Sequence, residues 1–582
     1  MSGRIASAAK AQWGWIWGYS GSHFSSDLVA AIVVTILLVP QSLAYALLAG
    51  LPPKVGIYAS ITPLLAYAVL GSSRQLNVGP TAVISLMTAA TISELPEELR
   101  IVGAAALALM VGVMLIGAGF LKAGFLMNFV SRPVVSAYIT GAALLIIISQ
   151  LRHIFGVVGG GRTAFSMLGN LRDQVSQTSL ITLVVGAAAL LVFYLARNNF
   201  AYRLVKLGVS SGRAKMVSRM APIFIIAVFI ILTWATGLDQ QGLAIVGTVP
   251  GGLPPFQIPM IETSLMKSLT IPAAVIAIVA FVDSTSTAQE LAARQRASIN
   301  ANRELFGLGA ANIAAGLAAG YAVNGSMSRS AVNAAAGGET PLSGIIVAAL
   351  MALTAMFLTP LLKPLPLSVL AALIIIACLS LLDFKAIWRT WVYSQIDGLT
   401  ALATFFSVLM LGVQYGVLVG VVLAMALHIR TTVNPHMPLV GRFPGTEHYR
   451  DAQRFVVETN EQVKTMRIDE SLYYANARTL EDRVATIVSE NPDLTDLILM
   501  CTAVNRIDAS ALSSLETVNN RLKAANIRLH FSDMQSRVRE GLFRSSFLDR
   551  LTGQIFLSQH EAMESLRPAP DWSFLDDHID MH

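Results

Sequence analysis

The sequence predicts a polytopic α-helical membrane protein that ends in a small α/β domain. Hydrophobic residues make up 54% of the 582 residues and charged residues only 13%, about half the charged share of a soluble domain. Apolar blocks fill the chain as far as His428, whereas ordinary polar sequence follows Gly441. Two further apolar segments are short and broken by Gly or Pro, at corresponding places in two halves of the apolar region. These observations predict fourteen membrane segments arranged as two inverted repeats of seven, with two half-helices among them.

Composition divides the chain into five parts. We expect an N-terminal segment, a transmembrane domain, a linker, an α/β domain and a tail at residues 1–26, 27–430, 431–439, 440–567 and 568–582. The first segment lacks the short apolar core and small-residue cleavage site of a signal peptide, so the first apolar block is expected to be retained. The two cysteines, Cys378 and Cys501, lie in different parts, which excludes a disulfide framework within the polar domain.

Twelve apolar blocks are long enough to cross a bilayer, taking about 20 apolar residues as one crossing. They lie at 27–50, 54–70, 100–121, 133–151, 178–196, 220–237, 269–290, 302–321, 343–362, 365–382, 396–412 and 415–430. The interrupted segments at 77–92 and 325–338 are too short or too broken to cross unaided. Counting these two as half-helices gives the fourteen segments.

Basic residues in the loops predict the orientation. With the N-terminus in the cytoplasm, the cytoplasmic flanks hold sixteen Lys and Arg and the opposite flanks seven, which is the asymmetry of the positive-inside rule. Arg152, Arg162 and Arg172 fall on the opposite side, against the rule. We therefore expect a cell inner or plasma membrane protein with both termini in the cytoplasm. Loop placement also explains the net charge of +6, and without a basic and aromatic patch we expect no nucleic-acid partner.

The two broken segments predict an anion site. Gly79-Pro80 and Asn324-Gly325 suit the start of a helix in mid-membrane, where irregular backbone is tolerated only beside a polar cavity. The start of a helix presents free N–H groups and the positive end of its dipole. Two such starts that face each other from opposite repeats would attract an anion between them.

Arg329 lies about one turn into the second half-helix. A charge at this depth is costly and is kept for function or for pairing, and a forked guanidinium suits an oxyanion. We expect Arg329 to attract the substrate; the alternatives are that it neutralises a carboxylate such as Asp283 or snorkels to the cytoplasmic edge.

Asp283 lies in an apolar block and has Thr287 one turn later on the same face. A desolvated carboxylate can exchange a proton, and with hydroxyl partners it can hold sodium. We therefore expect Asp283 to couple transport to an ion, the alternative being a fixed salt bridge to Arg329.

Gln41 and Tyr45 follow Pro40 and share one helix face. Gln41 can donate two hydrogen bonds to an anion, and Tyr45 supplies a ring and a hydroxyl. We expect both at the site, although Gln41 could instead bond only a neighbouring helix.

Three segments resemble the SulP anion transporters, the sulfate-permease family that includes the animal multifunctional anion exchangers. They are VPQSLAYALLAGLPPKVGIYAS, GSSRQLNVGPTAVISLM and NGSMSRSAVNAAAGGETPLSG, in the family's order. The resemblance covers nearly the whole chain. It implies a core domain of segments 1–4 and 8–11 that moves like an elevator against a gate domain of segments 5–7 and 12–14. It also implies a homodimer.

The resemblance implies an anion site between the third and tenth segments. Matched by motif, the site residues are Gln41, Tyr45, Pro80, Thr81, Ala82, Ser326, Ser328 and Arg329. Asp283 falls where related transporters have an acidic coupling residue. Many proton-coupled members have Glu there, whereas Asp with Thr287 also resembles the sodium site of the bicarbonate-transporting branch, so both coupling ions stay open.

The polar domain resembles a STAS domain. TMRIDESLYY, TDLILMCTAV and IRLHFSD are strand-like, and the stretches at 475–490 and 509–525 have helical periodicity. This alternation predicts an α/β layer fold. IDASALSSL resembles the loop that carries the phosphorylated serine of the soluble anti-sigma-factor antagonists, which places Ser510 at that position. The alternative is a helix N-cap role nearby.

These features predict a secondary active transporter of small inorganic oxyanions, with proton-coupled sulfate uptake favoured. The alternatives are a sodium-coupled bicarbonate symporter, a chloride or dicarboxylate exchanger, and a membrane anion sensor that signals through the STAS domain to a cytoplasmic partner. No metal-ligand spacing, Walker loop or nucleophile elbow occurs. We therefore expect no enzyme activity, no cofactor and no metal apart from sodium at Asp283 and Thr287. The expected partners are the anion, the coupling H⁺ or Na⁺, membrane lipid and a second copy of the chain.

Overall fold

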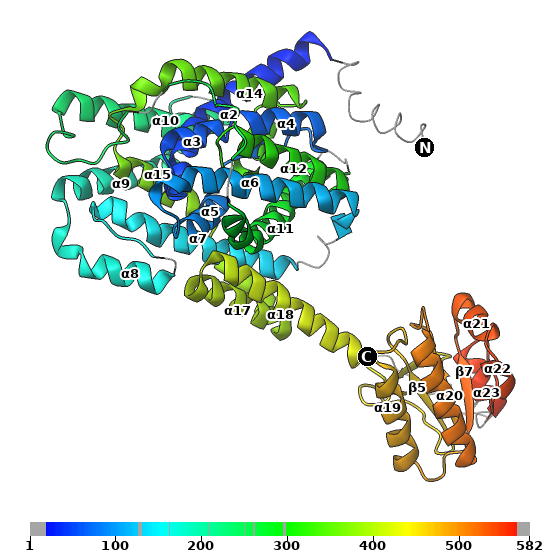
Figure 1. The fold of residues 1–582 in the computed structure, drawn as a ribbon. Coiled ribbons are helices and arrows are strands. Elements are labelled where there is room, and N and C mark those ends of the chain that lie inside the picture. Colours follow the sequence, from blue (N-terminus) through cyan, green and yellow to red (C-terminus); the bar gives the residue numbers. More distant parts are fainter. Residues whose placement is uncertain are drawn as a thin grey trace. The chain divides into compact units, whose positions relative to one another are not determined.

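The chain forms two compact units, Met1–Ala424 and Met425–His582, which are described separately below (Figure 1). The computed structural model describes residues 19–125, 131–161, 163–208, 210–248, 251–259, 262–294 and 298–566. Most of the expected N-terminal segment and the whole of the expected tail at 568–582 lie outside the described residues.

The first unit is a helical polytopic membrane fold. Its first half contains α2 (Gly21–Leu48), α3 (Pro53–Tyr58), α4 (Thr62–Leu70), α5 (Ala82–Ile92), α6 (Glu97–Phe120), α7 (Arg132–Phe155), α8 (Ala164–Asp173), α9 (Leu180–Lys206) and α10 (Ser211–Thr236). Its second half contains α11 (Thr263–Arg294), α12 (Ala301–Leu317), α13 (Met327–Ala335), α14 (Leu342–Leu353), α15 (Leu367–Cys378), α16 (Phe384–Tyr393), α17 (Gln395–Leu411) and the start of α18 (Val413–Val433). Among the described residues, seven helices are long and apolar enough to cross a membrane, and five shorter apolar helices accompany them.

Each of the twelve predicted crossings contains a helix, but the crossing predicted at 54–70 is divided into α3 and α4. Pro63 lies in the first turn of α4, where its missing N–H and fixed φ favour a new helix start. Two short helices, α8 and α16, lie outside the predicted segments. The side chain of Thr163 caps α8 by accepting a hydrogen bond from the N–H of Ser166 at 3.2 Å.

Both predicted half-helices are present, and their starts adjoin. β1 (Val78–Gly79) precedes α5, and β2 (Asn324–Gly325) precedes α13. The two strands pair antiparallel, with Val78 opposite Gly325 and Gly79 opposite Asn324. The chain therefore enters α5 and α13 in opposite directions from one short ribbon.

The surrounding helices hold this ribbon in the interior. α5 contacts α2, α6, α7 and α11, among the helices drawn in the middle of the membrane unit in Figure 1. α6 and α12 pack at glycines: a Cβ on Gly112 would lie 2.7 Å from the carbonyl oxygen of Gly309, and one on Gly309 2.9 Å from that of Gly112. Small residues of this kind let membrane helices approach closely.

The second unit carries a five-stranded sheet in the order β4-β3-β5-β6-β7. The strands are β3 (Leu439–Arg442), β4 (Tyr449–Asp451), β5 (Val463–Arg467), β6 (Asp496–Met500) and β7 (Arg528–Ser532). The helices are α19 (Ala477–Glu490), α20 (Ala509–Ala524), α21 (Ser536–Phe543), α22 (Phe547–Arg550) and α23 (Gln559–Leu566). β5, β6 and β7 are parallel and are the three predicted strands; α19 and α20 are the predicted helices that connect them. The hairpin of β3 and β4 was not predicted, because strands of three or four residues leave little periodicity to detect.

Candidate functional site

Asn77 joins the starts of the two half-helices. Its backbone carbonyl accepts a hydrogen bond from the N–H of Ser326 at 3.0 Å, and its own N–H donates to Oγ of Ser330 at 2.8 Å. Its side-chain Oδ1 accepts from Nε of Arg329 at 3.0 Å. One residue before β1 therefore fixes the first turn of α13 from three sides.

The guanidinium of Arg329 reaches from α13 to the start of α5. Nη1 donates to the carbonyl oxygen of Pro80 at 2.8 Å, and the residue is only 1% exposed. Nη2 is buried and has no hydrogen-bond partner among the described residues. It lies beside Gly79, where a Cβ would be 3.3 Å away. A buried cation with one unsatisfied donor gains free energy from an anionic acceptor, because a buried unpaired donor carries a desolvation penalty.

The helix starts themselves carry hydroxyl side chains. Thr81 is the N-cap of α5, but its side chain does not cap the helix; Oγ1 donates instead to Oδ1 of Asn324 at 2.5 Å. Ser326 is the N-cap of α13, and its Oγ accepts from the N–H of Arg329 at 3.5 Å. Ser328 is exposed, with its Oγ 3.3 Å from that of Ser326. N–H groups at the start of α5 are thus left without a side-chain cap, as an anion site at a helix start requires.

α11 supports the ribbon from the other side. Nδ2 of Asn324 donates to Oδ2 of Asp283 at 2.6 Å, and Oγ of Ser284 accepts from the N–H of Gly325 at 2.8 Å. Asn324 therefore links the carboxylate of Asp283 to the hydroxyl of Thr81. Among the described residues no ion pair joins Asp283 to Arg329, so the alternative of a salt bridge between them is not realised in this structure.

The remaining predicted residues lie on α2, α5 and α11, and both α2 and α11 contact the two half-helices. The place where the starts of α5 and α13 meet is called the crossing below. Tyr45 and Ala82 are 8% and 6% exposed, and α2, which carries Tyr45, contacts both α5 and α13. The Oε1 atom of Gln41 is buried without a partner among the described residues. Thr287 is buried.

Sequence reasoning assigned no bridging role to the residues that join the two repeats, namely Asn77, Tyr321, Asn324 and Ser330. Tyr321 donates to or accepts from Oγ of Ser85 at 2.9 Å. The available signal was an asparagine just before each half-helix, Asn77 and Asn324, since amides seldom occur at such depth without a partner.

Two buried carboxylates were also missed. Glu304, on α12, accepts from the hydroxyl of Tyr67 at 2.8 Å and from the N–H of Ser73 at 3.1 Å. Asp27, on α2, accepts from the N–H groups of Glu339 and Thr340 at 2.9 and 3.2 Å. These bonds join distant segments, so both carboxylates stabilise the fold around the crossing.

Ser510 is exposed in the first turn of α20. The N-cap is Asp508, whose Oδ1 accepts from the N–H of Ala511 at 2.9 Å. Backbone hydrogen bonds, the one from Ala511 above all, lower the pKa of Asp508. The cap therefore leaves the hydroxyl of Ser510 free of a capping role, and its modification stays a prediction.

Comparison with known proteins gives consistent matches over most of the chain. The Sulfate permease family matches residues 24–404, and the STAS domain matches residues 454–562. A probable sulfate transporter of Mycobacterium tuberculosis is 35% identical over 560 residues, covering 94% of this chain and 96% of that protein.

Two solved structures have a similar fold. The structure of SLC26A9 has a TM-score of 0.86 at 22% identity, covering 97% of this chain and 93% of that chain. The transmembrane domain of a cyanobacterium bicarbonate transporter, BicA, has a TM-score of 0.58 at 21% identity, covering 70% of this chain and 98% of that chain.

Proposed function

Because the chain belongs to the sulfate permease family, we propose that it is a secondary active transporter of small inorganic oxyanions. Sulfate is the favoured substrate, since the relative from Mycobacterium tuberculosis is named a probable sulfate transporter. The observation that carries the proposal is the crossing of the half-helices, where the buried guanidinium of Arg329 has one unpaired donor beside Gly79.

The proposed anion site lies between the starts of α5 and α13. Nη2 of Arg329, the free N–H groups at Thr81 and Ala82, and the hydroxyls of Ser326 and Ser328 supply donors to an oxyanion. Gln41 and Tyr45 approach from α2. Each hydrogen bond to the charged anion contributes about 1.5–3 kcal/mol. Because the donors are several, the site suits a tetrahedral anion with several acceptor oxygens.

We propose that Asp283 couples the anion to a proton. Its ionised carboxylate faces the site through Asn324 and repels a bound anion. Protonation removes this repulsion, so that the proton and the anion bind cooperatively. Protonation also makes Asp283 a weaker acceptor for the amide of Asn324. Because Thr81, at the start of α5, donates to the same amide group, its hydrogen bond depends on the protonation of Asp283.

Sodium-coupled bicarbonate symport is the second candidate. It is favoured by the buried hydroxyl of Thr287, which lies one turn from Asp283 on the same helix face. Oxygen ligands from both residues would suit a sodium ion better than a proton.

We also propose how the transporter moves and assembles, from its membership of the sulfate permease family. The crossing moves as part of a core domain against a gate domain, in a homodimer whose termini face the cytoplasm. The STAS domain binds a cytoplasmic partner, and Ser510 is its candidate regulatory position.

The test is uptake of labelled sulfate by the purified protein in proteoliposomes. We expect an inward proton gradient to drive accumulation, and a panel of bicarbonate, chloride and dicarboxylates to compete weakly. Stimulation by a sodium gradient alone would replace the proton by sodium as the coupling ion. Protein that binds sulfate but moves none would instead support an anion sensor that signals through the STAS domain.

A further inference from the structure

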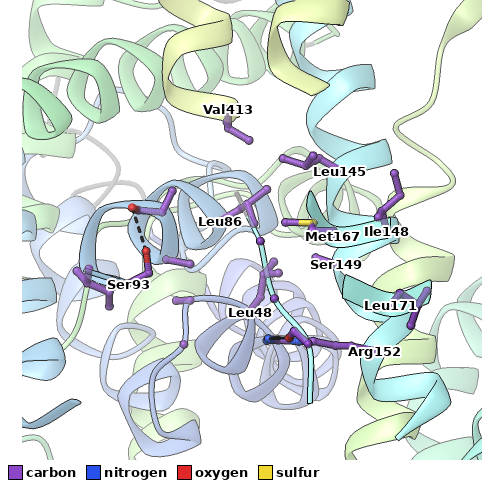
Figure 2. A pocket seen from close by; sticks show the side chains of 18 of the residues that line it. Leu48, Leu86, Ser93, Leu145, Ile148, Ser149, Arg152, Met167, Leu171 and Val413 are labelled. Atoms are coloured by element: carbon purple, nitrogen blue, oxygen red, sulfur yellow. Dashed lines mark hydrogen bonds between the residues drawn. The ribbon is translucent and has the colours of Figure 1, made fainter. Parts of the chain in front are cut away.

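A second polar feature lies in the membrane unit, away from the crossing. A cavity of about 290 Å³ is lined by α2, α5, α6, α7, α8, the loop at 159–161 and the start of α18. Figure 2 shows Arg152 and Leu48 at one end of the labelled side chains and Val413 at the other. The walls between them are mainly aliphatic, with Leu86 and Leu145 among them.

Two helices connect the cavity to the crossing. α5 begins at the crossing with Ala82, and its later residues from Leu86 onwards line the cavity. One helical turn separates these two residues, a rise of about 6 Å. α2 likewise carries Gln41 and Tyr45 and then lines the cavity with Leu48. The cavity and the crossing therefore share α2 and α5.

The charged residues that line the cavity are all positive. Arg100 and Arg152 both line the cavity, and no acidic residue does so among the described residues. Glu97 and Glu98 lie nearby in the sequence, in the exposed first turn of α6, outside the lining. Apolar walls of low dielectric around two cations focus the positive field into the cavity.

Arg152 is held so that part of its guanidinium stays available. Nη1 donates to the carbonyl oxygen of Gly159 at 2.6 Å, and Nε donates to Nε2 of His153 at 3.1 Å. His153 is therefore the acceptor of this bond. No hydrogen bond of Nη2 occurs among the described residues. Gly160 lies against the same group, since a Cβ there would be 3.6 Å from Nη1.

We propose that this cavity is a second, weaker anion site, with Arg152 as its main contact, which collects small inorganic anions before they pass to Arg329. The proposal rests on the proposed function, because it deepens the route of the same substrate. It also gives a physical reason for Arg152, one of the three arginines that oppose the positive-inside rule.

The first test measures the KM for sulfate in proteoliposomes at low and at high ionic strength. We expect Arg152→Gln to raise the KM about threefold to tenfold at low ionic strength, and to flatten its dependence on salt, because steering by a charged cleft is screened. Arg152→Lys should restore part of the loss, and kcat should change little. Arg172→Gln is the matched control, since Arg172 lies on α8 but does not line the cavity.

The outcomes separate the cavity from the crossing. A wild-type KM and salt dependence in Arg152→Gln, or an equal loss in Arg172→Gln, would overturn the proposal while leaving the transport function intact. If the wild-type protein moves no anion at all, sulfate binding in detergent decides. We then expect Arg329→Gln to keep a weak binding component that a further Arg152→Gln removes. Because no lipid is present in this measurement, a lipid phosphate cannot supply the signal. Absence of the weak component would refute the second site.

Discussion

Replacing Asp283 by Asn tests whether this carboxylate couples proton and anion binding. The hydrogen bonds from Asn324 to Asp283 and from Thr81 to Asn324 are 2.6 and 2.5 Å long. With the amide group between them, this chain of atoms has a length of about 8 Å, which we use as the separation between the carboxylate and an anion at the start of α5. At an effective dielectric constant of about 20, the carboxylate and the two negative charges of sulfate repel each other by about 4 kcal/mol at this separation, or about a thousandfold in affinity. Asn keeps an acceptor for Asn324 but removes the charge.

We therefore expect sulfate binding to the wild type to tighten on acidification, and binding to Asp283→Asn to be tight and independent of pH. Calorimetric titration across pH measures both. In proteoliposomes the variant should still exchange internal for external sulfate but should no longer accumulate it in response to a proton gradient. Thr287→Val is the control, because loss of its hydroxyl should leave proton coupling intact and impair sodium coupling. Accumulation by Asp283→Asn at the wild-type level would refute the reasoning.

Four further predictions concern other parts of the chain. Arg329→Ala should weaken sulfate binding about a hundredfold, on the order of 3 kcal/mol. Arg329→Lys should restore the affinity only partly, because one ammonium cannot replace the forked contacts to Asn77 and Pro80. Unchanged affinity of Arg329→Ala in calorimetry would show that Arg329 has a structural role. Asn77→Asp keeps the shape but places a carboxylate on Arg329, so it should abolish sulfate binding with little change in the melting temperature. Gly112→Ala should lower the melting temperature, at a cost of about 1–3 kcal/mol, whereas Gly117→Ala, on the same helix with no atom within 4 Å of its Cβ, should not; equal melting temperatures would contradict the close packing of α6 and α12. In the STAS domain, burial lowers the pKa of His530 although Asp496 accepts its hydrogen bond. The folded domain therefore binds fewer protons than the unfolded chain and should lose stability as the pH falls below about 6.5. Hydrogen exchange at β7 between pH 7.5 and 5.5 measures this loss in the full chain, and His530→Gln should remove the dependence on pH.

The membrane helices could be predicted because each one is a long apolar block in the sequence. The half-helices were also predictable, because Gly79-Pro80 and Asn324-Gly325 interrupt apolar segments in corresponding places. α8 and α16 were missed, since ten residues with mixed polarity do not reach the length of a crossing. The predictions of a sulfate-permease fold, of a STAS domain and of a protein that is not an enzyme are confirmed by the family matches.

The contacts within the site could not be predicted in the same way. Asn324 bonds Thr81 across 243 positions of the chain, and Arg329 bonds Asn77 across 252. Such pairs depend on how the two repeats pack against each other, which no local pattern records. For the same reason the sequence left a salt bridge between Asp283 and Arg329 open, whereas the structure places Asn324 on Asp283 and Asn77 on Arg329.

These contacts restrict how the site can open to each side of the membrane. β1 and β2 form one ribbon, Arg329 of the second repeat bonds Asn77 and Pro80 of the first, and Asn324 bonds Thr81. Separating α5 from α13 would break all these bonds in a buried region and leave several donors and acceptors unpaired, at about 1–3 kcal/mol for each. The two half-helices are therefore expected to move together as one body. Access would then alternate at the surfaces where this body contacts the other helices, which favours the proposed elevator over a gate that opens between the two half-helices.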